Sequence, residues 1–385
     1  MSRSWDVFCR VVDNFGDAAV CWRLARQLAA EHGGRVRLWI DALPALHSLC
    51  PDVDATCAKQ VVGGVMVLRW SADAEFGAPA QIVVEAFGCG LPESYVESMV
   101  ARHPSPVWII LEYLSAEPWV ASHHGLPSPH PRLPLERHFF FPGIGPGTGG
   151  VLRESSFGQR RAAFEASSGA QAGFWQDLEF APTAAKDVVV SLFGYENPSV
   201  AALMQAWSVG EDRIVVAVPR SSLRPQVCEF FGSADPGDGA TLVKGSLEVR
   251  FLPFLPQPVY DELLWACDWN FVRGEDSFVR AQWAERPLLW HIYPQREGQH
   301  RVKLDAFLDV YCAALEPAVV GALRGLSHLW NGSEAAQSGQ IQAAWESLNG
   351  QRVQMRRHAR AWAGRLGLPG DLAGNLAQYC EERLK

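Results

Sequence analysis

Two carboxylates, Asp13 and Asp17, flank the short segment Asn14-Phe15-Gly16 directly after an apolar run over residues 5–12. That run predicts the first strand of the chain, and the apolar spacing over residues 18–32 predicts a helix after it. Open α/β sheets bind ligands at the carboxyl ends of their strands, so carboxylates there could accept a proton or stabilise positive charge. A structural role is equally open, because Asp17 could cap the helix and Asp13 could close a turn.

A second polar segment, Arg273-Gly274-Glu275-Asp276-Ser277, follows an apolar run and precedes a predicted helix. The backbone N–H groups at a helix start, together with the Arg273 guanidinium and the Ser277 hydroxyl, could hold a diphosphate. Glu275 and Asp276 do not fit a simple anion site, and Asp276 or Ser277 could instead be an ordinary helix cap. The segment therefore indicates either phosphate binding or helix capping.

The elements that would position these residues fall into two sets. Predicted strands and helices alternate over residues 5–115 and again over residues 187–292, which is typical of mostly parallel sheets covered by helices. Between them, residues 115–150 are rich in proline and glycine, and a G-x-G-x-x-G pattern there lacks the flanking strand and apolar helix of a dinucleotide site. We therefore expect two Rossmann-like α/β domains: residues 1–150, which include this loop and linker, and residues 151–385, which include a helical tail.

The composition is that of an ordinary folded protein, with 48% hydrophobic and 20% charged residues among 385. The net charge of −8 disfavours nucleic acid and anionic membranes as partners, whereas a basic substrate or partner fits it better.

The sequence also predicts the cellular setting. No run approaches 18 apolar residues and no signal-peptide pattern is present, so we expect a cytoplasmic protein that does not contact membranes. The nine scattered cysteines contain no C-x-x-C pair and predict reduced, mostly buried thiols. Four histidines between residues 123 and 138 lack paired carboxylate ligands, so no metal site is expected.

Short sequence blocks spread over most of the chain are more specific than any single motif. They comprise residues 5–9, 11–17, 111–117, 124–129, 139–143, 148–150, 273–277 and 293–295. Together they resemble one family, the bacterial protein-arginine rhamnosyltransferases that modify elongation factor P.

The resemblance implies a GT-B glycosyltransferase, with two facing Rossmann-like domains and a cleft between them. The C-terminal domain would bind the donor, dTDP-β-L-rhamnose, and the N-terminal domain would bind the acceptor protein, elongation factor P. The sugar would pass with inversion to one arginine side chain, without a metal ion or a cofactor.

The resemblance also implies roles for particular residues. Asp13, Asp17 and Glu275 correspond to catalytic carboxylates. The nucleotide-sugar pocket corresponds to Phe193, Tyr195, Phe254, Gln257, Arg273, Asp276 and Ser277. Glu112 and His124 are a separate hypothesis for contact with the acceptor.

The chemistry implied by this family fits these residue types. A guanidinium is a poor nucleophile because its pKa lies above about 12, so a site must hold it in place and take a proton as the C–N bond forms. Asp17 is the predicted base, whereas Asp13 would orient the guanidinium or stabilise charge on the sugar, and Glu275 could do either. Arg273 and Ser277 would stabilise the leaving diphosphate, and the aromatic residues could stack on thymine or cover the sugar.

Two other classes of function compete with this prediction. A nicotinamide-dependent oxidoreductase of double-Rossmann type needs a glycine-rich turn after the first strand, where this chain has Asn14-Phe15-Gly16-Asp17. A non-catalytic scaffold could bind a translation factor through the proline-rich loop, but acidic residues at a strand end favour catalysis.

Overall fold

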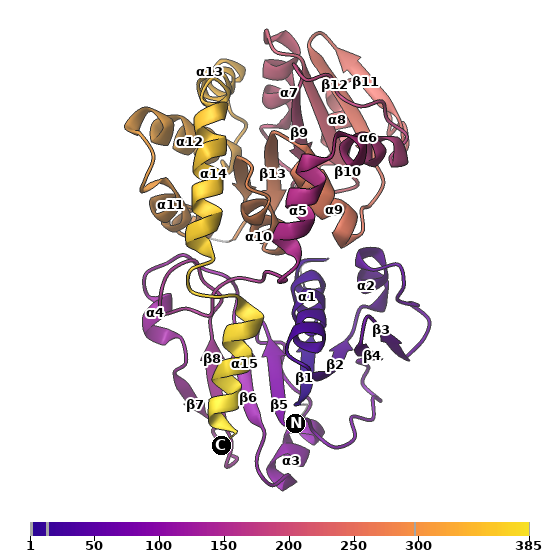
Figure 1. The fold of residues 1–385 in the computed structure, drawn as a ribbon, viewed down its shortest axis with the longest axis vertical. Helices are drawn as coiled ribbons and strands as arrows, with labels where there is room; N and C mark the ends of the chain where they lie inside the picture. Colours follow the sequence, from indigo (N-terminus) through magenta and orange to yellow (C-terminus); the bar gives the residue numbers. More distant parts are fainter. Residues whose placement is uncertain (1–2, 13–14, 296–297, 385) are drawn as a thin grey trace. The chain divides into compact units, whose positions relative to one another are not determined.

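The computed structural model describes residues 3–12, 15–295 and 298–384, and the chain forms two compact units (Figure 1). Unit 1 comprises Met1–Ser155 with Leu366–Lys385, and unit 2 comprises Ser156–Arg365. The predicted boundary after residue 150 therefore lies a few residues before the observed one.

Unit 1 is built on an eight-stranded sheet with the order β3-β4-β2-β1-β5-β6-β8-β7. The inner strands are parallel, whereas β3 and β7 pair antiparallel with their neighbours at the two edges. The strands are β1 (Ser4–Cys9), β2 (Arg35–Ile40), β3 (Lys59–Val62), β4 (Val65–Arg69), β5 (Ile82–Ala86), β6 (Val107–Leu111), β7 (Pro127–Pro129) and β8 (Glu136–Phe140). The helices are α1 (Gly16–Glu31), α2 (Leu43–Leu49), α3 (Glu93–Ala101), α4 (Val120–His123) and α15 (Leu372–Arg383).

Unit 2 repeats this plan with a six-stranded sheet in the order β11-β12-β10-β9-β13-β14. Only the edge strand β11 is antiparallel to its neighbour among the strands described. The strands are β9 (Val188–Leu192), β10 (Ile214–Pro219), β11 (Thr241–Lys244), β12 (Leu247–Leu252), β13 (Trp269–Arg273) and β14 (Leu288–His291). The helices are α5 (Phe157–Ala166), α6 (Ser168–Asp177), α7 (Val200–Val209), α8 (Arg224–Phe230), α9 (Gln257–Ala266), α10 (Asp276–Trp283), α11 (Gln299–Cys312), α12 (Pro317–Trp330), α13 (Ser338–Asn349) and α14 (Arg352–Leu366).

The central strands are buried along their whole length, as expected for parallel strands with helices on both faces. Every residue of β5, β6, β9 and β13 is buried. The predicted site residues follow the carboxyl ends of the strands, which is where open α/β sheets bind their ligands.

The end of the chain returns to unit 1, contrary to the prediction that the whole helical tail belongs with the second domain. The helical tail is interrupted after α14. Asp371 then caps α15 by accepting a hydrogen bond from the Gly374 N–H at 3.0 Å. Gln27 of α1 donates to Asp371 Oδ1 at 2.9 Å, and the Tyr379 hydroxyl donates to the Gly125 carbonyl at 3.0 Å. These contacts hold α15 in unit 1, and Figure 1 shows the helix among the elements of that unit.

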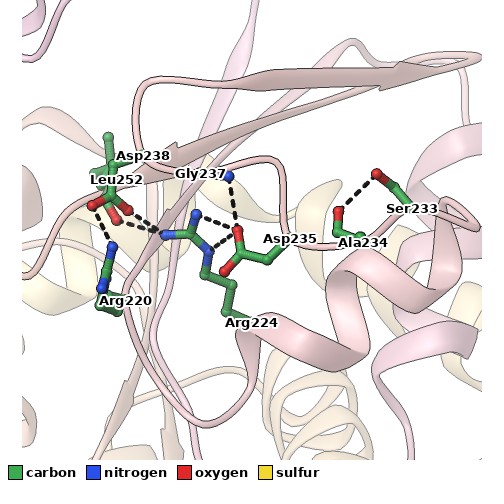
Figure 2. A network of polar contacts seen from close by, with 8 residues as sticks. All are labelled: Arg220, Arg224, Ser233, Ala234, Asp235, Gly237, Asp238 and Leu252. Carbon is green, nitrogen blue, oxygen red and sulfur yellow. Dashed lines mark hydrogen bonds and ion pairs between the residues drawn. The ribbon is translucent and has the colours of Figure 1, made fainter.

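A buried arginine fixes the loop between α8 and β11 in unit 2 (Figure 2). The Arg224 side chain is 2% exposed and forms ion pairs with Asp235 at 2.6 Å and Asp238 at 2.5 Å. Asp235 also accepts a hydrogen bond from the Gly237 N–H, and Arg224 donates to the carbonyl of Leu252, the last residue of β12. The network ties the loop to the carboxyl end of β12.

The cysteines are mostly buried, as predicted. All nine lie within the described ranges, none forms a disulfide there, and six are buried. Among the helices of the described ranges, none combines the length and the apolar character needed to cross a bilayer.

Candidate active site

Asp17 lies in the first turn of α1, just after the carboxyl end of β1, and is 2% exposed. Its Oδ2 accepts a hydrogen bond from the Val12 N–H at 2.8 Å, and its Oδ1 accepts one from the Tyr113 hydroxyl at 3.1 Å. The helix begins at Gly16, and Phe15 occupies the N-cap position without a side-chain cap. The alternative in which Asp17 caps this helix is therefore wrong. Instead, hydrogen bonds from two different segments of the chain hold its carboxylate in one orientation.

Tyr113 is a site residue that the sequence did not single out. It follows β6, and its ring stacks on Phe87 with ring centroids 4.4 Å apart and an interplanar angle of 15°. Phe87 follows β5 and has a φ of 56°, which is rare for a residue with a side chain and is often seen at functional sites. The carboxyl ends of β1, β5 and β6 thus bring Asp17, Phe87 and Tyr113 together.

Three other residues of unit 1 were predicted to lie at the site: Asp13, Glu112 and His124. Asp13 lies outside the described residues, so its role stays a prediction. Glu112 is half-buried, and its N–H donates to the Phe140 carbonyl at 3.0 Å, which continues the pairing of β6 with β8. His124 Nδ1 accepts a hydrogen bond from the Phe141 N–H at 3.1 Å, and burial lowers the pKa of its imidazole. The imidazole therefore supports the backbone after β8, and contact of Glu112 or His124 with an acceptor stays a prediction.

In unit 2, Arg273 ends β13 between two aromatic rings from the segment after the neighbouring strand β9. Its Cζ lies 4.7 Å from the ring centroid of Phe193 and 4.6 Å from that of Tyr195. A flat guanidinium stacks well on aromatic faces, and Arg273 is only 9% exposed. The aromatic rings predicted to contact the nucleotide sugar therefore also hold a positive charge in place.

The turn after β13 depends on a glycine. Gly274 has a φ of 59°, which a glycine adopts without strain, and its carbonyl accepts a hydrogen bond from Trp290 Nε1 at 2.8 Å. Glu275 takes the N-cap position of α10 with no side-chain cap, so the alternative that Asp276 or Ser277 caps this helix is wrong. The Ser277 hydroxyl accepts a hydrogen bond from the Arg273 N–H at 3.0 Å and donates to the Arg273 carbonyl. Ser277 therefore holds the backbone of Arg273.

The other predicted donor residues lie at the same edge of this sheet. Phe254 is half-buried in the segment after β12, and Gln257 begins α9 and is 4% exposed. Gln257 Nε2 donates to Asp276 Oδ2 at 3.4 Å. The structure thus brings Gln257 to Asp276, and Phe193 and Tyr195 to Arg273.

Two uncharged titratable groups lie beside Arg273, and the sequence predicted neither. The Tyr260 ring packs against Phe193 with centroids 5.4 Å apart, and burial raises the pKa of its phenol. Burial, followed by the positive charge of Arg273, lowers the pKa of His291 to about 3. Arg273 is therefore flanked by a neutral phenol and a neutral imidazole. Across the described ranges, no three His, Cys, Asp or Glu side chains are grouped so that they could hold a metal ion.

Two such units, each a mostly parallel sheet with helices, make up the GT-B fold of glycosyltransferases. The chain has this fold. An α-glucosyltransferase solved with UDP and a 13-mer DNA has this fold, with a TM-score of 0.50 and 9% identity over 100% of this chain and 98% of that one. A structure that explains EarP-mediated arginine glycosylation of translation elongation factor EF-P is more similar, with a TM-score of 0.70 and 32% identity over 99% of each chain.

The sequence comparisons identify the family. The family model for Elongation-Factor P (EF-P) rhamnosyltransferase EarP matches residues 5–381. The protein-arginine rhamnosyltransferase of Pseudomonas putida is 44% identical over 386 residues, which cover 100% of both chains. The chain therefore belongs to the family of elongation factor P rhamnosyltransferases. This result confirms the resemblance and the GT-B prediction, and it favours a glycosyltransferase over the oxidoreductase and the scaffold.

Proposed function

We propose that this protein transfers L-rhamnose from dTDP-β-L-rhamnose, with inversion, to the side chain of one arginine in elongation factor P. The match to the family over residues 5–381 carries this proposal. In the transfer, a nitrogen of the guanidinium bonds to the anomeric carbon, the bond from that carbon to dTDP breaks, and the guanidinium gives up one proton. The donor, the acceptor and the residue roles below all belong to the proposal.

On the donor side, Arg273 supplies a positive charge for the diphosphate. Its guanidinium is held by two side chains of the protein, Phe193 and Tyr195, so little reorganisation is needed when negative charge develops on the leaving group. The start of α10 adds the partial positive charge of a helix N-terminus. Phe254 and the faces of the two rings are the proposed contacts for thymine and the sugar.

Gln257 and Asp276, also at the proposed donor site, have a different role from that of Arg273. Gln257 and Asp276 are hydrogen-bonded to each other, and together they can donate hydrogen bonds to hydroxyl groups and accept hydrogen bonds from them. Ser277 contributes by fixing the backbone of Arg273. Glu275, at the turn before α10, is the proposed third carboxylate of the reaction.

On the acceptor side, Asp17 is the proposed base. Its carboxylate is almost fully buried and fixed by the Val12 N–H and the Tyr113 hydroxyl, which supports a role that needs one defined orientation. Asp13 is proposed to orient the guanidinium or to stabilise positive charge on the sugar. A net charge of −8 suits a cationic acceptor, and a cytoplasmic location and a reaction without a metal ion or cofactor complete the proposal.

The test is a reaction of the purified full-length protein with folded elongation factor P and dTDP-β-L-rhamnose, followed by intact mass. We expect the addition of one deoxyhexose, unchanged by a chelator, and no addition when the acceptor arginine is replaced by lysine. Because lysine keeps the charge but not the planar fork, this control separates recognition of a guanidinium from recognition of charge. An unmodified elongation factor P after prolonged incubation with the wild-type protein would refute the proposal.

A further inference from the structure

His291 is the last residue of β14 and pairs in register with Arg273, the last residue of the parallel strand β13. The two side chains therefore belong to neighbouring positions at the carboxyl end of the same sheet. His291 is 4% exposed, and its Nδ1 has no hydrogen-bond partner among the residues that the structure describes. Such a buried polar ring, at the end of an otherwise apolar strand, is not explained by packing of the core alone.

The imidazole lies between two aromatic rings. It meets Tyr195 with ring centroids 5.4 Å apart and an interplanar angle of 76°, and it meets Trp330 at 5.6 Å and 61°. Trp330, at the end of α12, is fully buried and cannot easily move. Tyr195 in turn lies 4.6 Å from Arg273 Cζ. A continuous line of contacts therefore runs from Trp330 through His291 and Tyr195 to the guanidinium.

The backbone on both sides of His291 is also fixed. Asn331 Oδ1 accepts a hydrogen bond from the Ile292 N–H at 3.1 Å, and Asn331 Nδ2 donates to the Trp290 carbonyl at 2.8 Å. A Cβ atom at Gly194 would lie 3.2 Å from His291 Nδ1, so the segment that carries Tyr195 passes close to the imidazole. A rigid ring in this place limits where the Tyr195 ring can go.

We infer that His291 is a positioning residue for the proposed donor site, where its ring supports Tyr195 and thereby holds the Arg273 guanidinium ready for a diphosphate. The inference rests on the proposed function. An uncharged ring suits this place because a second positive charge beside Arg273 would oppose the first, and the imidazole is neutral at physiological pH.

Calorimetric titration with dTDP-β-L-rhamnose tests the inference on the full-length protein. His291→Leu fills the space without an aromatic ring, and we expect it to weaken donor binding on the order of 3- to 30-fold, the range of one cation–π contact. His291→Phe keeps the ring, and we expect donor binding within about 2-fold of wild type.

His358→Leu is the matched control. It also replaces a buried histidine of unit 2 that meets a tyrosine edge to face, Tyr311, at 4.7 Å, but Tyr311 has no stacked arginine in the described chain. We expect it to lower stability without changing donor affinity. Equal affinities for wild type and His291→Leu, or equal losses for His291→Leu and His358→Leu, would overturn the inference.

A double-substitution experiment distinguishes positioning from a general loss of structure. If His291 acts through Arg273, His291→Leu has less than about 2-fold effect on donor affinity in an Arg273→Ala background, because the group it positions is gone. A full additional loss in that background would overturn the inference. Wild-type protein that binds no dTDP-β-L-rhamnose would refute the proposed function itself and this inference with it.

Discussion

Tyr113→Phe removes the hydrogen bond from the phenol to Asp17 Oδ1 and leaves the stacking on Phe87 in place. The lost bond joins the phenol to a carboxylate oxygen at 3.1 Å, and hydrogen bonds to charged groups contribute about 1.5–3 kcal/mol. Tyr113 is 41% exposed, so water can replace part of this interaction. We therefore expect a loss of about 1–1.5 kcal/mol of transition-state stabilisation, which is about a 5- to 12-fold decrease in kcat/KM for elongation factor P.

The assay is the initial rate of rhamnosylation by intact mass, with donor affinity measured in parallel by calorimetry. Donor affinity should stay at the wild-type value, because the residues proposed to bind the donor all lie in unit 2. Asp17→Asn is the reference variant. It keeps the size of the side chain and an oxygen that can accept from Tyr113, but it cannot take up the proton, and we expect a loss of at least about 100-fold.

Two results would refute this reasoning. An unchanged kcat/KM for Tyr113→Phe would mean that its hydroxyl does not orient the carboxylate. An Asp17→Asn variant that keeps most of its turnover would mean that another group is the base. If both groups act together, Tyr113→Phe should also have little further effect in an Asp17→Asn background.

Three further variants test unit 2. Arg273→Lys keeps the charge but loses the stacked planar fork, so donor binding should weaken by about 1–2 kcal/mol in calorimetry, whereas equal affinity would mean that charge alone is recognised. Gly194→Ala would place a Cβ 2.7 Å from Cδ1 of the fully buried Leu223, so the free energy of unfolding in urea should fall by about 1–3 kcal/mol, and wild-type stability would mean that Leu223 can move aside. The hydrogen bond from the Gly237 N–H, followed by Arg224, lowers the pKa of Asp235. The ionised Asp235 carboxylate therefore stabilises the fold above the unfolded-state pKa, and this stabilisation is lost as the pH falls through the folded-state pKa. The Tm of Asp235→Asn should therefore lie below that of wild type at pH 7, and the difference should shrink as the pH falls below the ordinary aspartate range of about 4, whereas a difference that stays constant would contradict the assignment.

The central strands could be predicted from the sequence because they are buried on both faces. The segment of β9 reads Val-Val-Val-Ser-Leu and is entirely buried, so its apolar run is visible without any structure. The edge strands β3, β7 and β11 have four residues or fewer, and Val61 and Val243 in β3 and β11 are largely exposed. Strands this short, with exposed apolar side chains, carry little periodicity, so no local pattern predicts them.

The candidate site was predictable only in part. Polar residues that interrupt an apolar run, such as Asp17 and Arg273, indicate the carboxyl ends of strands, and the structure places them there. The contacts of Tyr113 with Asp17, 96 positions apart in sequence, depend on tertiary packing that no local pattern carries. His291 ends an apolar strand, and a local pattern cannot distinguish it from a core residue. The capping alternatives failed because a shift of one or two residues at a helix start changes which side chain can reach the first turn.

Both halves of the proposed reaction depend on a charged side chain that neighbouring residues hold in place. Asp17 is held by hydrogen bonds from a backbone N–H and a phenol, whereas Arg273 is held by two aromatic faces and by Ser277 at its backbone. A carboxylate can be oriented by hydrogen-bond donors. A guanidinium can only donate hydrogen bonds, and stacking on its flat faces orients it without using its N–H groups. Each charge is thus fixed by residues of its own unit. It follows that substitutions around Asp17 should lower turnover with the acceptor and spare donor affinity, and that substitutions around Arg273 should lower donor affinity first.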